Sequence, residues 1–180
     1  MRFTIILLIT LLIFTVFVMR TNQQQEFHPS KGEQLVNATL ASAAQTIKEK
    51  YDIKPCGSGA AMPGGPIQEL ILCFDTKHPY SKWQLRELLI KSAKELLNQI
   101  NENDEIQEFL KERPFTIKNV EVIIYNHDEN GRCLCDPEIS TARISQTVLI
   151  YRTVDPQDSF KFKNEYEESY EEALKALSTH

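Results

Sequence analysis

The strongest hydrophobic pattern in the chain is a continuous apolar run near its amino end. Residues 3–19 are all apolar apart from three threonines, and an arginine flanks the run on each side. As a helix this run would be about 25 Å long, which is the lower limit for crossing the hydrocarbon core of a bilayer. The pattern predicts a transmembrane signal anchor over residues 1–19 that contacts the membrane through residues 3–19.

A cleaved signal peptide has a similar layout, but it ends in small residues just before the cleavage site. Here the first serine is Ser30 and the first alanine is Ala38, both well beyond the apolar run. The first cysteine is Cys56, so the cysteine of a lipid-anchor cleavage site is also missing. We therefore expect an uncleaved anchor and a single-pass membrane protein with an extracytoplasmic domain. The alternative is a secreted protein whose leader is removed.

After the anchor the pattern changes to a polar linker and then to helical spacing. Residues 20–33 are polar, contain one proline and one glycine, and show no apolar period, which is typical of a flexible linker. Over residues 34–50, apolar and small side chains recur at helical spacing, which predicts a helix. We expect residues 34–180 to form a single domain, because about 150 residues suffice for one core but hardly for two.

The next stretch carries the densest turn signal in the chain. Residues 54–66 hold four of the six glycines and three of the eight prolines, which predicts a mobile surface loop. Gly57 and Gly59 begin a GxGxxG pattern, but Met62 stands at its third glycine position. Because the stretch also leads into a strand instead of a helix, we predict no phosphate site there.

The best-defined helix spans residues 81–101. Ser81 and Gln84 have the spacing of a capping box, and leucines, alanine and isoleucine then form one apolar stripe. A second, short helix over residues 104–111 must stop before Pro114.

The remaining segments indicate a sheet. Residues 67–75 have a continuous apolar centre, which predicts a central strand buried on both faces. Further strands are expected over residues 115–125, 139–145 and 148–154, with a tight turn between the last two. Residues 164–177 show the spacing of a closing helix. The sequence therefore predicts an α+β fold, a two-layer domain with a four-stranded, mostly antiparallel sheet and helices packed on one face.

Composition and charge limit the partners of this domain. Hydrophobic residues make up 42% and charged residues 25% of the chain, both ordinary for a globular protein. The formal net charge is −5. This balance gives no electrostatic reason to bind nucleic acid.

The cysteines and one histidine are the candidate metal-ligating residues. Cys133 and Cys135 form a Cys-x-Cys turn close to His127 and Asp136, and thiolate and imidazole are ligands for soft metals. Cys56 could complete such a set. The spacing departs from the Cys-x₂-Cys pairs of structural zinc sites, so we predict no metal. The pattern leaves open a metal site, one disulfide that joins Cys56 to Cys133 or Cys135, and free thiols.

No catalytic motif accompanies these residues. The sequence lacks the Gly-x-Ser-x-Gly elbow and the His-Glu-x-x-His helix. His127 lies at a strand end, but Asp128 and Glu129 follow it, which is typical of a solvated loop histidine. Cys73 lies within an apolar strand, where a cysteine acts as a small hydrophobe. We therefore predict no catalytic residue and no cofactor, and the sequence favours a protein that is not an enzyme.

Several segments carry a resemblance to other proteins. Residues 66–75, the segment RPFTIKNVEVIIYNHDENGR, and the later segments YRTVDPQ and YEESYEEAL look similar to small membrane-anchored or exported bacterial proteins of uncharacterised function. The resemblance spans most of the domain. It implies a bacterial envelope or secreted protein, and it carries over no catalytic residue.

The leading functional hypothesis is a non-catalytic, membrane-tethered domain that binds another protein or is associated with the envelope. The glycine-rich stretch and the turn at residues 133–136 are its expected contact surfaces, because loops on a rigid scaffold usually carry recognition. The first alternative is a small enzyme or metal-binding protein with a site near His127, Cys133, Cys135 and Asp136. The second is a secreted factor with a cleaved signal peptide.

Overall fold

The structure of the chain, a computed structural model, describes residues 29–179. The predicted anchor over residues 1–19 and most of the predicted linker over residues 20–33 lie outside the described residues. Among the residues that are described, no helix combines the length and the apolar character needed to span a membrane.

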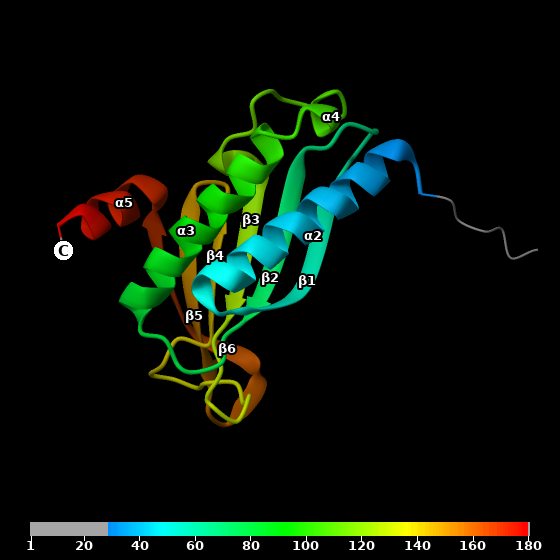
Figure 1. The fold of residues 1–180 in the computed structure, drawn as a ribbon. Helices are drawn as coiled ribbons and strands as arrows, with labels where there is room; N and C mark the ends of the chain where they lie inside the picture. The colour runs from blue at the N-terminus through cyan, green and yellow to red at the C-terminus, as the bar shows by residue number, and fades with distance from the viewer. Residues whose placement is uncertain (1–28, 180) are drawn as a thin grey trace, which may run out of the picture. The chain divides into compact units, whose positions relative to one another are not determined.

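A six-stranded mixed sheet forms one layer of the fold (Figure 1). The strands lie side by side in chain order: β1 (Lys54–Ala61), β2 (Glu69–Asp75), β3 (Val120–Tyr125), β4 (Thr141–Ser145), β5 (Val148–Asp155) and β6 (Asp158–Ser169). β2 and β3 run parallel, and the other neighbouring pairs are antiparallel. The α+β class is confirmed, whereas the prediction of four strands is wrong by two.

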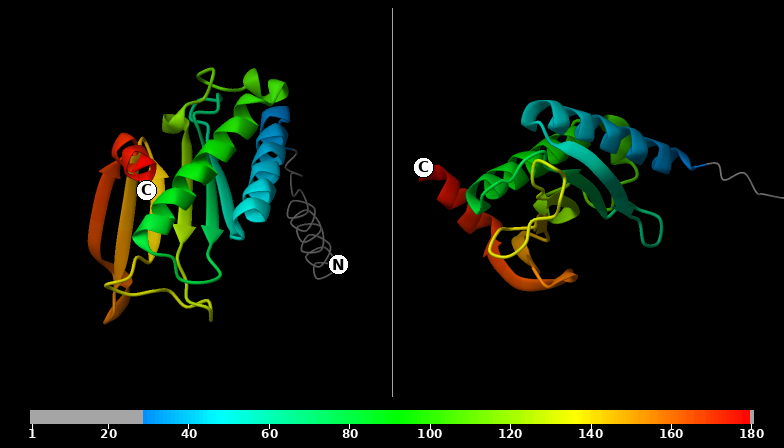
Figure 2. Two further views of the ribbon diagram at one scale, coloured as in Figure 1. Left: turned by 60° about the vertical axis from the view of Figure 1, so that its left-hand side comes forward. Right: turned by 90° about the horizontal axis from the view of Figure 1, so that it is seen from below.

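The second layer consists of the longest helices that the structure describes. They are α2 (Lys31–Tyr51), α3 (Lys82–Asn101) and α5 (Tyr170–Ser178), and they lie on the same side of the sheet (Figure 2). α3 joins the parallel strands β2 and β3, as a crossover helix does. The short helix α4 (Asp104–Gln107) and the 3₁₀ helix η1 (Ile117–Asn119) complete this crossover.

The helix predicted from Ser81 onward is confirmed together with its cap. The Ser81 hydroxyl accepts a hydrogen bond from the backbone N–H of Gln84, and the Gln84 side chain accepts one from the Ser81 backbone N–H. These two bonds satisfy amide groups that an uncapped helix would leave without partners.

β1 corrects the prediction of a loop over residues 54–66. This edge strand pairs with β2 from Lys54 to Ala61. The chain turns only in the connection that follows, where Gly64 and Gly65 have positive φ. Glycine weakens a strand but does not prevent one, because backbone groups alone form the ladder. The neighbouring apolar strand therefore overrides the local preference for a turn.

β6 corrects the prediction of a helix over residues 164–177. Strand β6 continues to Ser169, and only then does α5 begin, with a second capping box between Ser169 and Glu172. Tyr166 and Tyr170 are four residues apart, which imitates a helical stripe. Pairing with β5 and the burial of Glu168 decide in favour of the strand.

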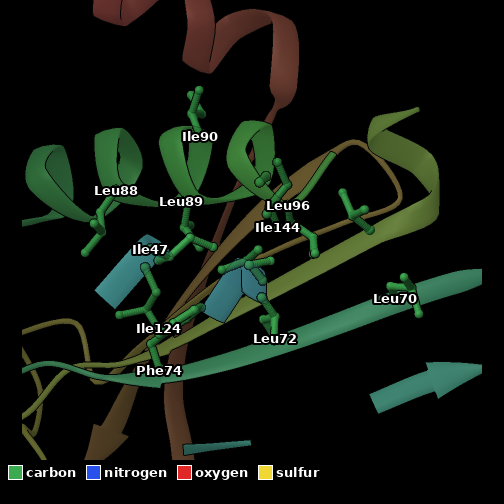
Figure 3. Packing of buried hydrophobic residues seen from close by; sticks show 14 of the residues in the cluster. Ile47, Leu70, Leu72, Phe74, Leu88, Leu89, Ile90, Leu96, Ile124 and Ile144 are labelled. Carbon is green, nitrogen blue, oxygen red and sulfur yellow. The ribbon is translucent and has the colours of Figure 1, made fainter. Parts of the chain in front are cut away.

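The core lies between α2, α3 and the sheet (Figure 3). Leu89 and Leu96 of α3 point at the strands, where Leu72 and Ile124 meet them, and all four side chains are almost fully buried. Truncating one such leucine to alanine typically costs about 2–5 kcal/mol.

The opposite side of the sheet is not covered by a helix of the described part of the chain (Figure 2). Strands β2 to β5 alternate between fully buried side chains on the helix side and half-buried ones on this other side, which we call the open face. The prediction that residues 67–75 are buried on both faces is therefore wrong. The open face carries Glu69, Ile71, Cys73, Asp75, Glu121, Ile123, Tyr125, Thr141, Arg143, Val148, Ile150 and Arg152.

Candidate functional site

Functional side chains gather where the parallel strands β2 and β3 end. Asp75 and Tyr125 are register partners at the carboxyl ends of these strands, and Asn126 and His127 follow directly in the chain. In open sheets, ligands tend to bind at the carboxyl ends of parallel strands because the loops there are free to carry side chains. This end of the sheet is therefore the candidate functional site.

Asn126 holds the backbone of the site together. Its side chain is fully buried. Its Oδ1 accepts a hydrogen bond from the Tyr80 backbone N–H at 2.9 Å, and its Nδ2 donates to the carbonyls of Tyr80 at 2.9 Å and Ile139 at 2.8 Å. Asn126 thus ties the end of β3 to the start of α3 and to the segment that leads into β4.

His127 is oriented by β2. Its backbone N–H donates to the Thr76 hydroxyl at 2.8 Å, and its Nδ1 lies 3.7 Å from the Asp75 carboxylate. A single β-bridge also joins His127 to Cys133. The backbones of His127 and Cys133 therefore lie side by side, as the sequence predicted, but the imidazole of His127 lies beside Asp75.

Cys56 reaches the same carboxylate from β1. The pairing of β1 with β2 shifts between Pro55 and Gly57, so Cys56 is the extra residue of a β-bulge. Burial, followed by the Asp75 carboxylate, raises the pKa of the Cys56 thiol to about 12. Asp75 thus lies next to both Cys56 and His127, two candidates far apart in sequence.

This arrangement does not activate Cys56 as a catalytic nucleophile, although its thiol can still take part in slow thiol–disulfide exchange. The thiolate is the reactive form of a cysteine, and a pKa of about 12 for Cys56 keeps its thiol protonated at neutral pH. Burial also raises the pKa of Cys73 and of Tyr125, which face the same carboxylate. These groups can exchange hydrogen bonds with a bound partner, but they lack the activation that covalent catalysis requires.

Cys133 and Cys135 form a separate pair in the loop that follows β3. Burial and then the neighbouring Cys135 raise the pKa of Cys133. The Cys133 thiol donates to the Leu134 carbonyl at 3.4 Å. The Cys133 thiol is therefore bonded within its own loop.

Asp136 fastens this loop to the far strands of the sheet. Its carboxylate accepts hydrogen bonds from the Thr153 hydroxyl at 2.9 Å, the Asn164 amide at 2.6 Å and the Lys163 ammonium at 2.8 Å. The Lys163 bond, followed by the Thr153 bond, lowers the pKa of Asp136. Asp136 therefore stabilises the loop and is already fully engaged.

The residues of the alternative metal or catalytic site thus lie in three places. His127 and Cys56 lie near Asp75, Cys133 and Cys135 lie in the loop, and Asp136 binds β5 and β6. Across residues 29–179, no three side chains of histidine, cysteine, aspartate or glutamate are grouped so that they could hold a metal ion.

Sequence reasoning missed the residue at the centre of the site. Asp75 is the polar residue that ends the apolar run of β2. A carboxylate at the end of a buried strand is the feature of the sequence that could have identified it as a site residue. Cys73 was assigned to the core, but it lies half-buried on the open face.

A hollow of about 400 Å³ lies beside this site, at the start of α3. Tyr80, Lys82, Glu138 and Tyr166 contribute to its lining. The Lys82 ammonium lies 4.8 Å from the Tyr151 ring centre and 5.1 Å from that of Tyr166. Cation–π contacts therefore already engage its positive charge.

Comparison of the chain with protein-family models, curated proteins and solved structures finds no match.

Proposed function

We propose that the domain is a non-catalytic, membrane-tethered module that binds an extended, uncharged segment of another protein along β1. The observation that carries this proposal is the character of β1, an edge strand beside the open face whose side chains from Pro55 to Ala61 are small and uncharged. Strand addition of this kind joins two proteins through backbone hydrogen bonds, with side-chain contacts that add specificity.

The two edges of the sheet differ in how well they are protected. Proteins usually block an exposed edge strand with charged side chains. β6 follows this rule, since charged side chains stand at every second position from Lys161 to Glu167. The features that protect an edge, Lys54, Pro55 and the bulge at Cys56, all lie at the start of β1, and from Gly57 to Ala61 the strand carries no charge. Among the described residues, β1 pairs with β2 only, which leaves its other side available.

The adjoining open face supports the same interaction. Register pairing places Gly59 beside Ile71 and Cys73 beside Ile123, so half-buried apolar side chains begin directly next to β1. Gly59 exposes the Ile71 side chain to a partner, because a Cβ built at Gly59 would lie 3.7 Å from it. A partner strand with apolar side chains on one face would extend this surface.

The membrane part of the proposal rests on residues 3–19. An anchored domain would meet partners that are anchored or exported as well. Extraction of native membranes with alkaline carbonate should leave the protein in the pellet, and sequencing of its amino end should find Met1. Recovery of a soluble chain that begins after residue 19 would favour the secreted alternative.

Site-specific photocrosslinking tests the binding edge in cells that express the full-length chain. A benzophenone amino acid at Ser58, an exposed position of β1, should give one discrete crosslinked protein. The same group at Ser159, an exposed position of β6, is the matched control and should give none. Equal products from both edges, or none from Ser58, would contradict the proposal.

A charge placed on β1 provides the second test. Gly59→Lys adds a charged side chain to the open side of the edge, and its Cβ makes only an ordinary contact with Ile71. We expect the crosslink from Ser58 to fall at least about tenfold, because burying an unpaired ammonium at a strand interface is costly. Ser159→Lys should leave it unchanged.

A further inference from the structure

We infer that Cys56 and Cys73 form a redox-sensitive thiol pair that closes to a disulfide between β1 and β2. The pair lies on the proposed binding strand β1 and its neighbour β2, but it rests on other observations than the binding proposal does. It differs from the pairings of Cys56 with Cys133 or Cys135 that the sequence left open. All four cysteines are free thiols in the structure.

The β-bulge brings the two sulfur atoms to one face. Cys73 is the register partner of Gly57, and the shift at Cys56 sets two residues of β1 against this one residue of β2. In such a bulge, the two residues of the longer strand share the face of the residue opposite. Cys56 therefore projects toward the open face, on which Cys73 also lies.

Gly57 leaves the space for a bond. A Cβ built at Gly57 would lie 3.5 Å from the Cβ and 3.7 Å from the Sγ of Cys73, so the Cys73 sulfur leans over the residue adjacent to Cys56. Gly57 and Cys73 are antiparallel register partners, whose Cα atoms lie about 4.5–5.5 Å apart, and Cys56 is the chain neighbour of Gly57. A disulfide spans Cα separations up to about 6.8 Å.

The electrostatics agree with this pairing. The Cys73 thiol is among the groups that raise the pKa of Cys56, whereas Cys133 interacts with Cys135 and the Ser140 hydroxyl. Cys56 is exposed and Cys73 is half-buried. Cys56 is therefore the thiol that an external disulfide reaches first, and Cys73 is the thiol that closes the bond.

A small-molecule disulfide such as oxidised glutathione is the oxidant. The Cys56 thiol loses its proton, and its sulfur attacks one sulfur of glutathione disulfide, which forms a mixed disulfide and releases one glutathione. The Cys73 sulfur, after loss of its proton, then attacks the Cys56 sulfur and releases the second glutathione. Two cysteine thiols are oxidised and one glutathione disulfide is reduced to two thiols, so atoms and electrons balance.

Mass spectrometry of the full-length chain in mild detergent tests the pair. The protein is equilibrated in oxidised glutathione, the remaining thiols are alkylated, and the chain is cut after glutamate, since Glu69 lies between the two cysteines. We expect two peptides joined through Cys56 and Cys73, while Cys133 and Cys135 are alkylated. The oxidised form should also unfold at a temperature about 5–10 °C higher.

Two variants complete the test. Cys56→Ala changes an exposed side chain and should keep the fold while it abolishes both the link and the gain in unfolding temperature. Cys135→Ala is the matched control and should retain both. A link from Cys56 to Cys133 or Cys135 would overturn the inference, and so would full alkylation of Cys56 and Cys73 after prolonged oxidation.

Discussion

The guanidinium of Arg86 on α3 and the carboxylate of Glu168 on β6 form a two-point hydrogen bond. Arg86 Nε lies 2.8 Å from Glu168 Oε1, and Arg86 Nη2 lies 2.8 Å from Oε2. Both side chains are about 15% exposed. The fully buried Tyr151 also donates its hydroxyl to Glu168. This network connects the second layer to the far edge strand of the sheet.

Breaking this pair is predicted to destabilise the domain. Glu168→Gln keeps the shape of the side chain but leaves the Arg86 charge half-buried without its counterion, which typically costs about 3–5 kcal/mol in buried pairs. We expect a loss of about 2–4 kcal/mol in the free energy of unfolding, measured by urea denaturation. Glu165→Gln removes a more exposed ion pair with Arg152 and should cost less than about 1 kcal/mol.

The same pair predicts a pH dependence of stability. Burial raises the pKa of Glu168, but the bonds from Arg86 and Tyr151 outweigh it, so the net pKa lies below the ordinary value of 4.5. A carboxyl with a lowered folded-state pKa stabilises the fold above its unfolded pKa, and this stabilisation is lost as the pH falls through the folded value. Wild-type stability should therefore decline more steeply below about pH 5 than that of Glu168→Gln. Parallel curves for the two proteins in urea denaturation would contradict this assignment.

The sequence was sufficient to predict the helices and turns whose local conformational preference agrees with their packing in the fold. The helix after Ser81 combines a capping box with an apolar stripe, and both point to the same structure. The turn at Gln146 and Thr147 was also predicted, although both residues have positive φ without being glycine. The α+β class follows from such elements.

The two edge strands were missed for different reasons. β1 is rich in glycine and has no alternation of apolar and polar residues. β6 does alternate, as in the segment FKFK at residues 160–163, but the helical spacing of Tyr166 and Tyr170 was given more weight. Their conformation is set by the neighbouring strands β2 and β5, a tertiary effect that a local window does not contain. The site was missed because only the parallel pairing of β2 with β3 brings Asp75 next to His127.

Asn126 is predicted to be essential for the geometry of the site. Asn126→Ala would leave the Tyr80 N–H and two backbone carbonyls without their partners in a buried position. Each such group costs about 1–3 kcal/mol, and we expect a total loss of about 3–5 kcal/mol in thermal or urea unfolding. Asn130→Ala in the exposed loop should be nearly neutral. A loss below 1 kcal/mol for Asn126→Ala would show that water replaces the amide.

Asp75 is predicted to control how fast the Cys56 thiol reacts. Its carboxylate is, after burial, the largest of the causes that raise the pKa of Cys56 to about 12. Asp75→Asn removes this negative charge, so the pKa should fall and the thiolate fraction at neutral pH should rise by about tenfold for each unit. The rate at which an aromatic disulfide reagent labels Cys56, followed by absorbance in a chain with the other three cysteines changed to alanine, measures this effect. Asp155→Asn, an aspartate at the end of β5, is the control and should leave the rate unchanged. An unchanged rate in Asp75→Asn would mean that burial alone sets the reactivity of Cys56.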